Sequence, residues 1–250
     1  MPFFTIITVV KNNFSTIERT ILSVLSQEFD DYEYIIIDGK SNDGTEDIIK
    51  KYSNHKNITI VSELDKGIYY AMNKGIEKSN GYWINLLNSD DYYINNKILQ
   101  KYYDKIKTDK NIDIVCSNMN ILFGDKIVRK MCPNPVYLKK NMQMNHPTWF
   151  VSTETYNTIG LFNINYKIAA DYEFALRCLK NNKKISIIDD FVSVNFALGG
   201  ASNISIKSVM ESFQIRKKYY LIGSLLNFNY LLFEFLDFLK SKIKKIIKWS

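Results

Sequence analysis

The stretch Trp83-Ile-Asn-Leu-Leu-Asn-Ser-Asp-Asp91 joins an apolar run to two adjacent aspartates. A short apolar run of this kind is typical of a buried strand. Two neighbouring carboxylates at the end of such a strand repel each other unless a cation is shared or lies nearby. The stretch therefore predicts an α/β fold with an acidic site at the end of one strand.

Similar apolar runs alternate with helical patterns on the N-terminal side of this stretch. This alternation predicts βαβ units and a mainly parallel sheet flanked by helices. Ser15-Thr-Ile-Glu18 reads as a capping box that begins the first helix. The expected strands are 3–10, 33–38, 58–61 and 82–88, and the expected helices lie near 15–25, 45–52 and 69–78.

The C-terminal half is less regular. We expect a fifth strand at 112–116, a helix near 171–179, and short strands at 185–188 and 191–196. A Gly/Ser/Asn-rich loop ends near residue 203, and helical sequence follows it. The predicted organisation is one α/β domain over residues 1–203 and a C-terminal helical segment over 204–250.

The charge distribution argues against a nucleic-acid-binding face. The chain carries a formal net charge of +7, but five lysines without an acidic neighbour lie between Lys240 and Ser250. The remaining body is almost neutral, whereas broad nucleic-acid binding needs basic residues across one face. We therefore expect no nucleic-acid partner.

The cysteines and the N-terminus favour a protein of the cytoplasm. Cys116, Cys132 and Cys178 have no CxxC or His-containing metal spacing, so a disulfide framework or a zinc site is not expected. The first ten residues lack the basic start and cleavage site of a signal peptide and read as a strand.

Polar residues follow each of the first four predicted strands. In an open parallel sheet, ligands bind beyond the carboxyl ends of the strands. Asp, Asn and Ser also form turns and helix caps, and this structural reading stays open for Ser41–Thr45. The strand-end residues are Thr8, Lys11 and Asn12, then Asp38, then Glu63 and Asp65, and finally Asn88-Ser-Asp-Asp91.

The aspartate pair predicts a divalent cation. Mg²⁺ and Mn²⁺ take oxygen ligands, commonly one or two carboxylates together with substrate phosphates. We interpret Asp91 as the direct ligand and Asp90 as its neighbour. The turn after the first strand contains no glycine, which disfavours a dinucleotide fingerprint, a P-loop and the phosphate loop of a sugar-nucleotide pyrophosphorylase.

Taken together, these segments resemble glycosyltransferase family 2, the inverting enzymes of the GT-A fold. The resemblance is carried by Thr5–Asn13, Tyr34–Thr45, Glu63–Tyr69 with Ala71–Gly75, and Leu86–Asp91. Tyr166-Lys-Ile-Ala-Ala-Asp-Tyr-Glu173 resembles the acceptor-side motif of the branch that builds bacterial surface polysaccharides and O-antigen.

The resemblance implies roles for individual residues. Asn88-Ser-Asp-Asp91 stands where the family has its DxD motif, with Asn88 replacing the usual first aspartate. Asp171 would be the general base that takes the acceptor hydroxyl proton; its alternative is a helix cap. His146 would contact the donor diphosphate or the acceptor. The implied nucleotide-sugar-binding residues are Thr8, Val10, Asn12, Asp38, Asp65, Lys66, Asn88, Ser89, Asp90 and His146.

The C-terminal segment reads as an amphipathic basic helix. Leu232, Leu236 and Leu239 share a face with Ile243 and Ile247, opposite the lysines. Such a helix lies on an anionic membrane surface, although a core-packing helix with a solvated lysine face fits the same pattern. We expect a peripheral protein on the inner face of a bacterial plasma membrane.

The sequence thus predicts an inverting, metal-dependent hexosyltransferase. The expected donor is a UDP-sugar carrying glucose, galactose or an N-acetylated form. The expected acceptor is a saccharide linked to polyprenyl diphosphate, and the expected cofactor is Mn²⁺ or Mg²⁺. Two alternatives remain at this point: a non-catalytic sugar-nucleotide-binding protein and a nucleotidyltransferase.

Overall fold

The computed structural model describes residues 1–139, 142, 144, 146–198 and 206–219 and confirms an α/β fold. The N-terminal half alternates strands and helices as the sequence predicts. Its elements are β1 (Phe4–Val10), α1 (Ile17–Leu25), β2 (Tyr32–Asp38), α2 (Thr45–Lys50), β3 (Ile58–Ser62), α3 (Ile68–Glu77) and β4 (Trp83–Leu86).

The second half adds strands to the same sheet and helices to its faces. Its elements are β5 (Tyr92–Tyr93), α4 (Ile98–Thr108), β6 (Ile114–Phe123), β7 (Lys126–Met131), η1 (Pro135–Tyr137), η2 (His146–Thr148), β8 (Phe150–Ser152), α5 (Thr153–Ile159), α6 (Ala170–Lys180), β9 (Ile185–Ala197) and α7 (Ile206–Tyr219).

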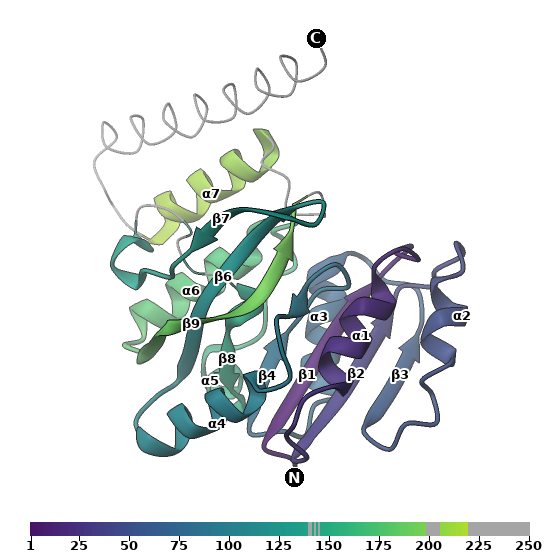
Figure 1. The fold of residues 1–250 in the computed structure, drawn as a ribbon. Helices are drawn as coiled ribbons and strands as arrows, with labels where there is room; N and C mark the ends of the chain where they lie inside the picture. Colours follow the sequence, from purple (N-terminus) through teal and green to yellow (C-terminus); the bar gives the residue numbers. More distant parts are fainter. Residues whose placement is uncertain (140–141, 143, 145, 199–205, 220–250) are drawn as a thin grey trace.

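The strands of the described residues form one sheet in the order β3-β2-β1-β4-β8-β6-β9-β5, with β7 paired to β6 (Figure 1). β3, β2, β1 and β4 are parallel neighbours. β8 is antiparallel to both β4 and β6, so it joins the parallel half to a mixed half. The carboxyl ends of β1 and β4 therefore meet the second half of the sheet at one edge.

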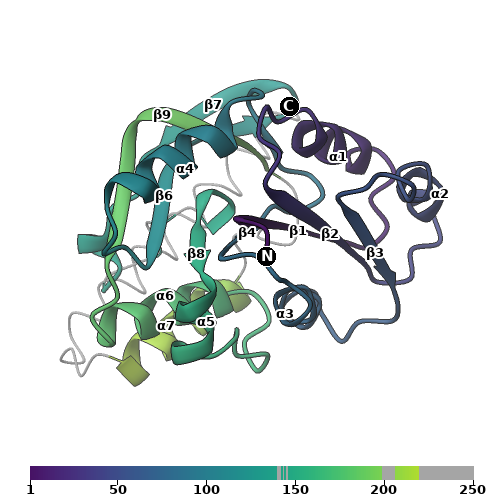
Figure 2. The same cartoon turned by 90° about the horizontal axis from the view of Figure 1, so that it is seen from below.

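Alternate residues of the central strands pack into two cores, one on each face of the sheet. Ile7 and Val9 of β1 pack with α3 and α6, whereas Phe4 and Ile6 pack with α1 and α4. This alternation follows from the two-residue period of a strand. Figure 2 shows the result, with α1 and α2 on one side of β1, β2 and β3 and α3 on the other.

The start of α1 differs from the prediction. The helix begins at Ile17 after Thr16, and no side chain caps it. The Thr16 hydroxyl instead donates to the Ser89 carbonyl oxygen at 2.8 Å, and Glu18 accepts from the Tyr52 hydroxyl at 3.0 Å. The predicted capping box is wrong because the N-cap residue is Thr16 and not Ser15, and because the side chains of Thr16 and Glu18 bond to tertiary partners and not to the first helical amides.

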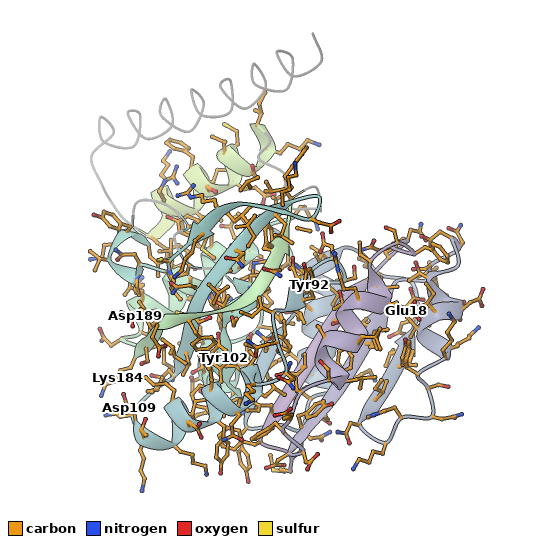
Figure 3. The ribbon with its side chains drawn as sticks, in the orientation of Figure 1. Glu18, Tyr92, Tyr102, Asp109, Lys184 and Asp189 are labelled. Carbon is orange, nitrogen blue, oxygen red and sulfur yellow. The ribbon has the colours of Figure 1, made fainter. Side chains whose placement is uncertain are left out.

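Helix α4 was missed because its exposed face is strongly charged and its apolar face is narrow. Tyr102 anchors this helix from within the core (Figure 3). Its hydroxyl lies 2.7 Å from the Thr148 carbonyl oxygen, 3.0 Å from Ser117 Oγ and 3.2 Å from Ser193 Oγ. One side chain thus ties α4 to β6, β9 and the turn after His146.

Within the part of the chain that the structure describes, no helix is long and apolar enough to cross a membrane. The Gly199-Gly200 loop, the boundary near residue 203 and the basic helix from residue 220 onward lie outside the described residues. The predicted membrane-binding role of that helix therefore stays a prediction.

Candidate active site

A cavity of about 1010 Å³ lies at the carboxyl ends of β1 and β4 and reaches across to β6, β7, β9 and α6. It brings together residues that are up to 189 positions apart in the chain, from Val9 to Leu198. Eight of the predicted site residues line it: Val10, Asn12, Asp65, Asn88, Ser89, Asp90, His146 and Asp171.

The turn that carries the aspartate pair is fixed by the loop after β1 and by α1. Asn13 Nδ2 donates to Ser89 Oγ at 2.9 Å. The Thr20 hydroxyl donates to the Asp91 carbonyl oxygen at 2.7 Å, and the Asp91 amide donates to the Asn88 carbonyl oxygen. These contacts hold the turn in one conformation, so the two carboxylates have defined positions.

The two aspartates have different environments. Asp90 lines the cavity, whereas Asp91 is fully buried behind it and accepts one hydrogen bond from the Ala197 amide. Burial raises the pKa of both carboxyls, and the neighbouring charge of Asp90 raises the pKa of Asp91 further. The structure thus places Asp90 where it can touch a ligand in the cavity, whereas Asp91, the predicted direct metal ligand, lies behind it.

The aspartate pair fits a divalent cation. Asp91 Oδ2 is buried and lacks a hydrogen-bond donor, so one carboxylate oxygen is uncompensated. Burying a negative charge is costly unless a positive charge or a proton compensates it. Among the described residues, no cluster of three or more His, Cys, Asp or Glu side chains is arranged to hold a metal ion.

Asp171 lies on the opposite part of the cavity wall, in the first turn of α6. Its Oδ1 accepts from the Tyr69 hydroxyl at 3.0 Å, and its Oδ2 lies 3.4 Å from His146 Nδ1. Burial raises the pKa of this carboxyl, but the His146 hydrogen bond and charge, together with the Tyr69 hydroxyl, lower the pKa below its ordinary value. Asp171 is therefore ionised at neutral pH.

Asp171 is not the N-cap residue of α6, although its Oδ1 accepts from the Tyr172 amide in the first turn at 2.9 Å. The N-cap residue of α6 is Ala169, and no side chain of the helix caps it. Asp171 is instead directed at His146 and Tyr69, both of which line the cavity. Its carboxylate is thus held for contact with the cavity.

His146 is positioned by β4. Asn85 Nδ2 donates to the carbonyl oxygens of Pro147 and Trp149, which fixes the turn that contains His146. Asn88 Nδ2 lies 3.2 Å from His146 Nε2. On the other side of the ring, His146 Nδ1 lies 3.4 Å from Asp171 Oδ2. His146 therefore links the aspartate-pair turn to Asp171.

Glu211 of α7 caps the segment that precedes Asp171. Its Oε2 accepts from the amides of Ile168 at 2.8 Å and of Ala169 at 3.1 Å, and its Oε1 accepts from the Lys167 amide at 2.9 Å. The first amides of a helix have no partner inside the helix, and a negative charge is favoured there. Ala169 offers no side-chain acceptor, so a carboxylate from another helix takes that role.

The half of the cavity beside β1 and β3 is polar. Asn12 adopts φ +52°, and its Oδ1 accepts from the Asn42 amide at 2.9 Å. Asp65 pairs with Lys74 Nζ at 2.7 Å, and the same ammonium lies 2.8 Å from Glu63. Asp38 lies behind this wall, fully buried, and accepts from the Ser62 hydroxyl at 2.6 Å. Asp38 therefore ties β2 to its flanking loops.

Two further predicted residues do not line the cavity. Thr8 is fully buried in β1, where its Oγ1 accepts from the Tyr34 hydroxyl at 2.9 Å. Lys66 is exposed on the loop before α3, outside the cavity wall. Thr8 and Val10 share a face of β1, and Val10 reaches the cavity because it is the last residue of the strand, whereas Thr8 lies two residues before that end.

Sequence reasoning missed two residues that act on Asp171. Tyr69 belongs to a segment that carries the family resemblance, yet no role was assigned to it. Glu211 lies 40 positions beyond Asp171, in a helix without any motif, and it gave no signal in the sequence.

The model of the family described as Glycosyl transferase family 2 matches residues 5–162. The chain is 27% identical over 213 residues to the PGL/p-HBAD biosynthesis glycosyltransferase of Mycobacterium bovis BCG, covering 81% of this chain and 80% of that protein. It is 26% identical to the UDP-Glc:alpha-D-GlcNAc-diphosphoundecaprenol beta-1,3-glucosyltransferase WfgD of Escherichia coli, covering 77% of this chain and 76% of the relative.

Solved structures show the same fold. Staphylococcus aureus TarS 1–349 in complex with UDP-GlcNAc superposes with a TM-score of 0.71 at 20% identity, over 91% of this chain and 70% of that one. The mannosyltransferase PcManGT of Pyrobaculum calidifontis, in complex with GDP-Man and Mn²⁺, superposes with a TM-score of 0.69 at 16% identity, over 89% and 65% of the two chains.

Replacing His146 by glutamine should raise the pKa of Asp171. The variant loses the imidazole charge that lowers this pKa, while the burial that raises it remains. Carboxyl resonances of ¹³C-labelled aspartate, followed through a pH titration, measure the change. His55→Gln is the control, because His55 is the other histidine of the chain and is exposed. An unchanged Asp171 titration in His146→Gln would contradict the coupling.

Replacing Glu211 by alanine should lower the free energy of unfolding by about 1–3 kcal/mol, because amides at the start of α6 lose their acceptor. Glu211→Gln keeps an acceptor oxygen and should lose less. Urea unfolding measures both, with Met210→Ala as control, since Met210 is the exposed preceding residue of the same helix. Equal effects of Glu211→Ala and Met210→Ala would refute the capping role.

Proposed function

Because the chain belongs to glycosyl transferase family 2, we propose that it is an inverting hexosyltransferase with a UDP-sugar donor and a lipid-linked saccharide acceptor. The observation that carries the proposal is the pairing of Asp90 and Asp171 in one cavity. The family membership supports neither the non-catalytic binding protein nor the nucleotidyltransferase that the sequence left open.

Inversion needs a base on the face of the sugar opposite the leaving diphosphate. Asp90 comes from the parallel half of the sheet, and Asp171 comes from α6 on the other half. A sugar placed between them has the diphosphate on the Asp90 side and the acceptor hydroxyl on the Asp171 side. This arrangement supports direct displacement by the acceptor oxygen at the anomeric carbon.

The nucleotide is assigned to the polar half of the cavity. Val10, Asn12 and Asp65 line that half and offer an apolar contact, an amide and a carboxylate. The carboxylate suits ribose hydroxyls, and the asparagine amide suits the edge of a uracil ring. Asp38 and Thr8 support this wall from behind, because both are buried beneath it.

A divalent cation, Mn²⁺ or Mg²⁺, is assigned to the aspartate pair. Asp90 would face the cation from the cavity wall, with the carboxyl group of Asp91 buried behind it. When bound, such a cation neutralises the charge that develops on a diphosphate leaving group. The Mn²⁺ of the mannosyltransferase PcManGT supports this assignment.

Asp171 performs the proton transfer. Its lowered pKa keeps the carboxylate ionised at neutral pH, and Tyr69 and His146 fix its direction. It receives the proton of the acceptor hydroxyl as the C–O bond to the sugar forms and the bond to the diphosphate breaks. Asn88 orients His146, and His146 in turn orients the base.

The acceptor and location follow from the relatives. WfgD is named for a UDP-glucose donor and a diphosphoundecaprenol-linked acceptor. A similar acceptor would place this chain at the inner face of the plasma membrane, where nucleotide sugars and lipid carriers meet. The proposed products belong to surface polysaccharide or lipooligosaccharide assembly.

Asp171→Asn should retain UDP binding and lose transfer by ~10²–10⁴-fold, since only the proton acceptor is removed. UDP affinity by calorimetry and product formation by mass spectrometry, with a panel of UDP-sugars and Mn²⁺, separate the two effects. Asp189→Asn is the control, because Asp189 is exposed on β9 at the edge of the molecule (Figure 3). Full transfer by Asp171→Asn would exclude Asp171 as the base.

A further inference from the structure

The second half of the cavity is walled by an apolar surface that spans three strands. Met119 and Ile121 of β6, Met131 of β7 and Phe196 of β9 all line the cavity. This part of the wall lies on the side of the sheet remote from β1, β2 and β3, which carry the proposed nucleotide site. It lines the same cavity as Asp171.

The strand register places these side chains on one face. Met119 pairs with Met131, and Ile121 pairs with Phe196 on its other side. Directly paired residues point to the same face of a sheet, and residues two positions apart share that face. The row continues to Phe123 at the end of β6, which is 59% exposed.

Methionine side chains are also concentrated around the same cavity, on α3 and before η2 as well as on β6 and β7. Five of the seven methionines of the chain line the one cavity. Flexible thioether side chains adapt to apolar ligands of varied shape. A saccharide alone would need convergent polar groups here, and this wall offers few. The five residues are Met72, Met119, Met131, Met142 and Met144.

Two cationic side chains share the face of this apolar surface. Arg129 pairs with Ile121, and Lys126 pairs with Phe123. Both are exposed. Lys130, by contrast, pairs with Asn120 and points to the opposite face. An apolar row with a cationic row beside it matches a ligand that has an apolar chain and an anionic group.

We propose that this surface binds the lipid part of the acceptor. The acceptor is an amphiphile whose hydroxyl-bearing end lies at Asp171, whose alkyl group packs on Met119, Ile121 and Phe196, and whose phosphate meets Arg129. The inference rests on the proposed function for the reaction itself. It adds where, and through which chemistry, the non-sugar part of the acceptor is recognised.

The test uses probes that contain no sugar, so that it does not depend on the acceptor saccharide. Dodecyl phosphate carries both the apolar chain and the anion, whereas dodecyldimethylphosphine oxide carries the chain without a net charge and methyl phosphate lacks the chain. Calorimetry below the micelle concentration should show binding of dodecyl phosphate and at least tenfold weaker binding of the other two. Absence of dodecyl phosphate binding would overturn the proposal.

Two pairs of variants locate the site, each pair making one chemical change on opposite faces of the hairpin. Arg129→Gln should weaken dodecyl phosphate binding, and Lys130→Gln should leave it unchanged. Ile121→Thr should weaken it, and Ile127→Thr should not, because Ile127 pairs with Leu122 on the other face. If the two variants of either pair lose dodecyl phosphate binding equally, the ligand does not bind at the proposed face and adsorbs nonspecifically, which would overturn the proposed position of the site.

UDP binding separates this inference from the proposed function. All four variants should bind UDP as the unmodified protein does, because these residues lie outside the proposed nucleotide half. If all variants bind UDP normally and the two members of each pair bind dodecyl phosphate equally, only the proposed lipid-binding surface is contradicted. If the unmodified protein does not bind UDP, the proposed function itself is contradicted.

Discussion

The site depends on the interactions of the Asp171 carboxylate with His146 and Tyr69. It stays ionised in a partly buried position only because neighbouring groups compensate its charge. Tyr69 comes from α3, His146 from the turn supported by β4, and Asp171 itself from α6. These three elements, which are distant in sequence, must therefore pack together before Asp171 is held as an ionised carboxylate that can act as a base.

The same dependence extends outward to α7. Glu211 fixes the amides directly before α6, and the Tyr69 hydroxyl lies 2.7 Å from the Ile168 carbonyl oxygen in the same segment. The backbone that carries Asp171 is thus held from two sides. A helix outside the cavity wall contributes to the position of a residue inside it.

The parallel half of the fold was predictable, and much of the mixed half was not. Periodic apolar runs with capping and turn residues located β1 to β4 and their helices within a few positions. Asp90 was found because two carboxylates at a strand end demand compensation. Local patterns do not encode which face a strand end presents, and the burial of Thr8 and Asp91, both predicted to contact a ligand, was therefore not predicted.

The family resemblance located Asp171 and His146, which spacing alone left ambiguous. Contacts across long sequence separations escaped prediction. Glu211 satisfies amides 42 to 44 positions away, and no motif links the two segments. The apolar surface of β6, β7 and β9 could likewise not be predicted from the sequence, because its residues become neighbours only through strand register.

The most direct test of this account is a crystal structure of the chain with UDP and Mn²⁺. In that crystal we expect uracil beside Asn12 and Asp65, and manganese between the diphosphate and Asp90. Asp171 should then face the diphosphate across an open space for the sugar. A nucleotide bound elsewhere, or manganese bound away from Asp90 with UDP present, would contradict it.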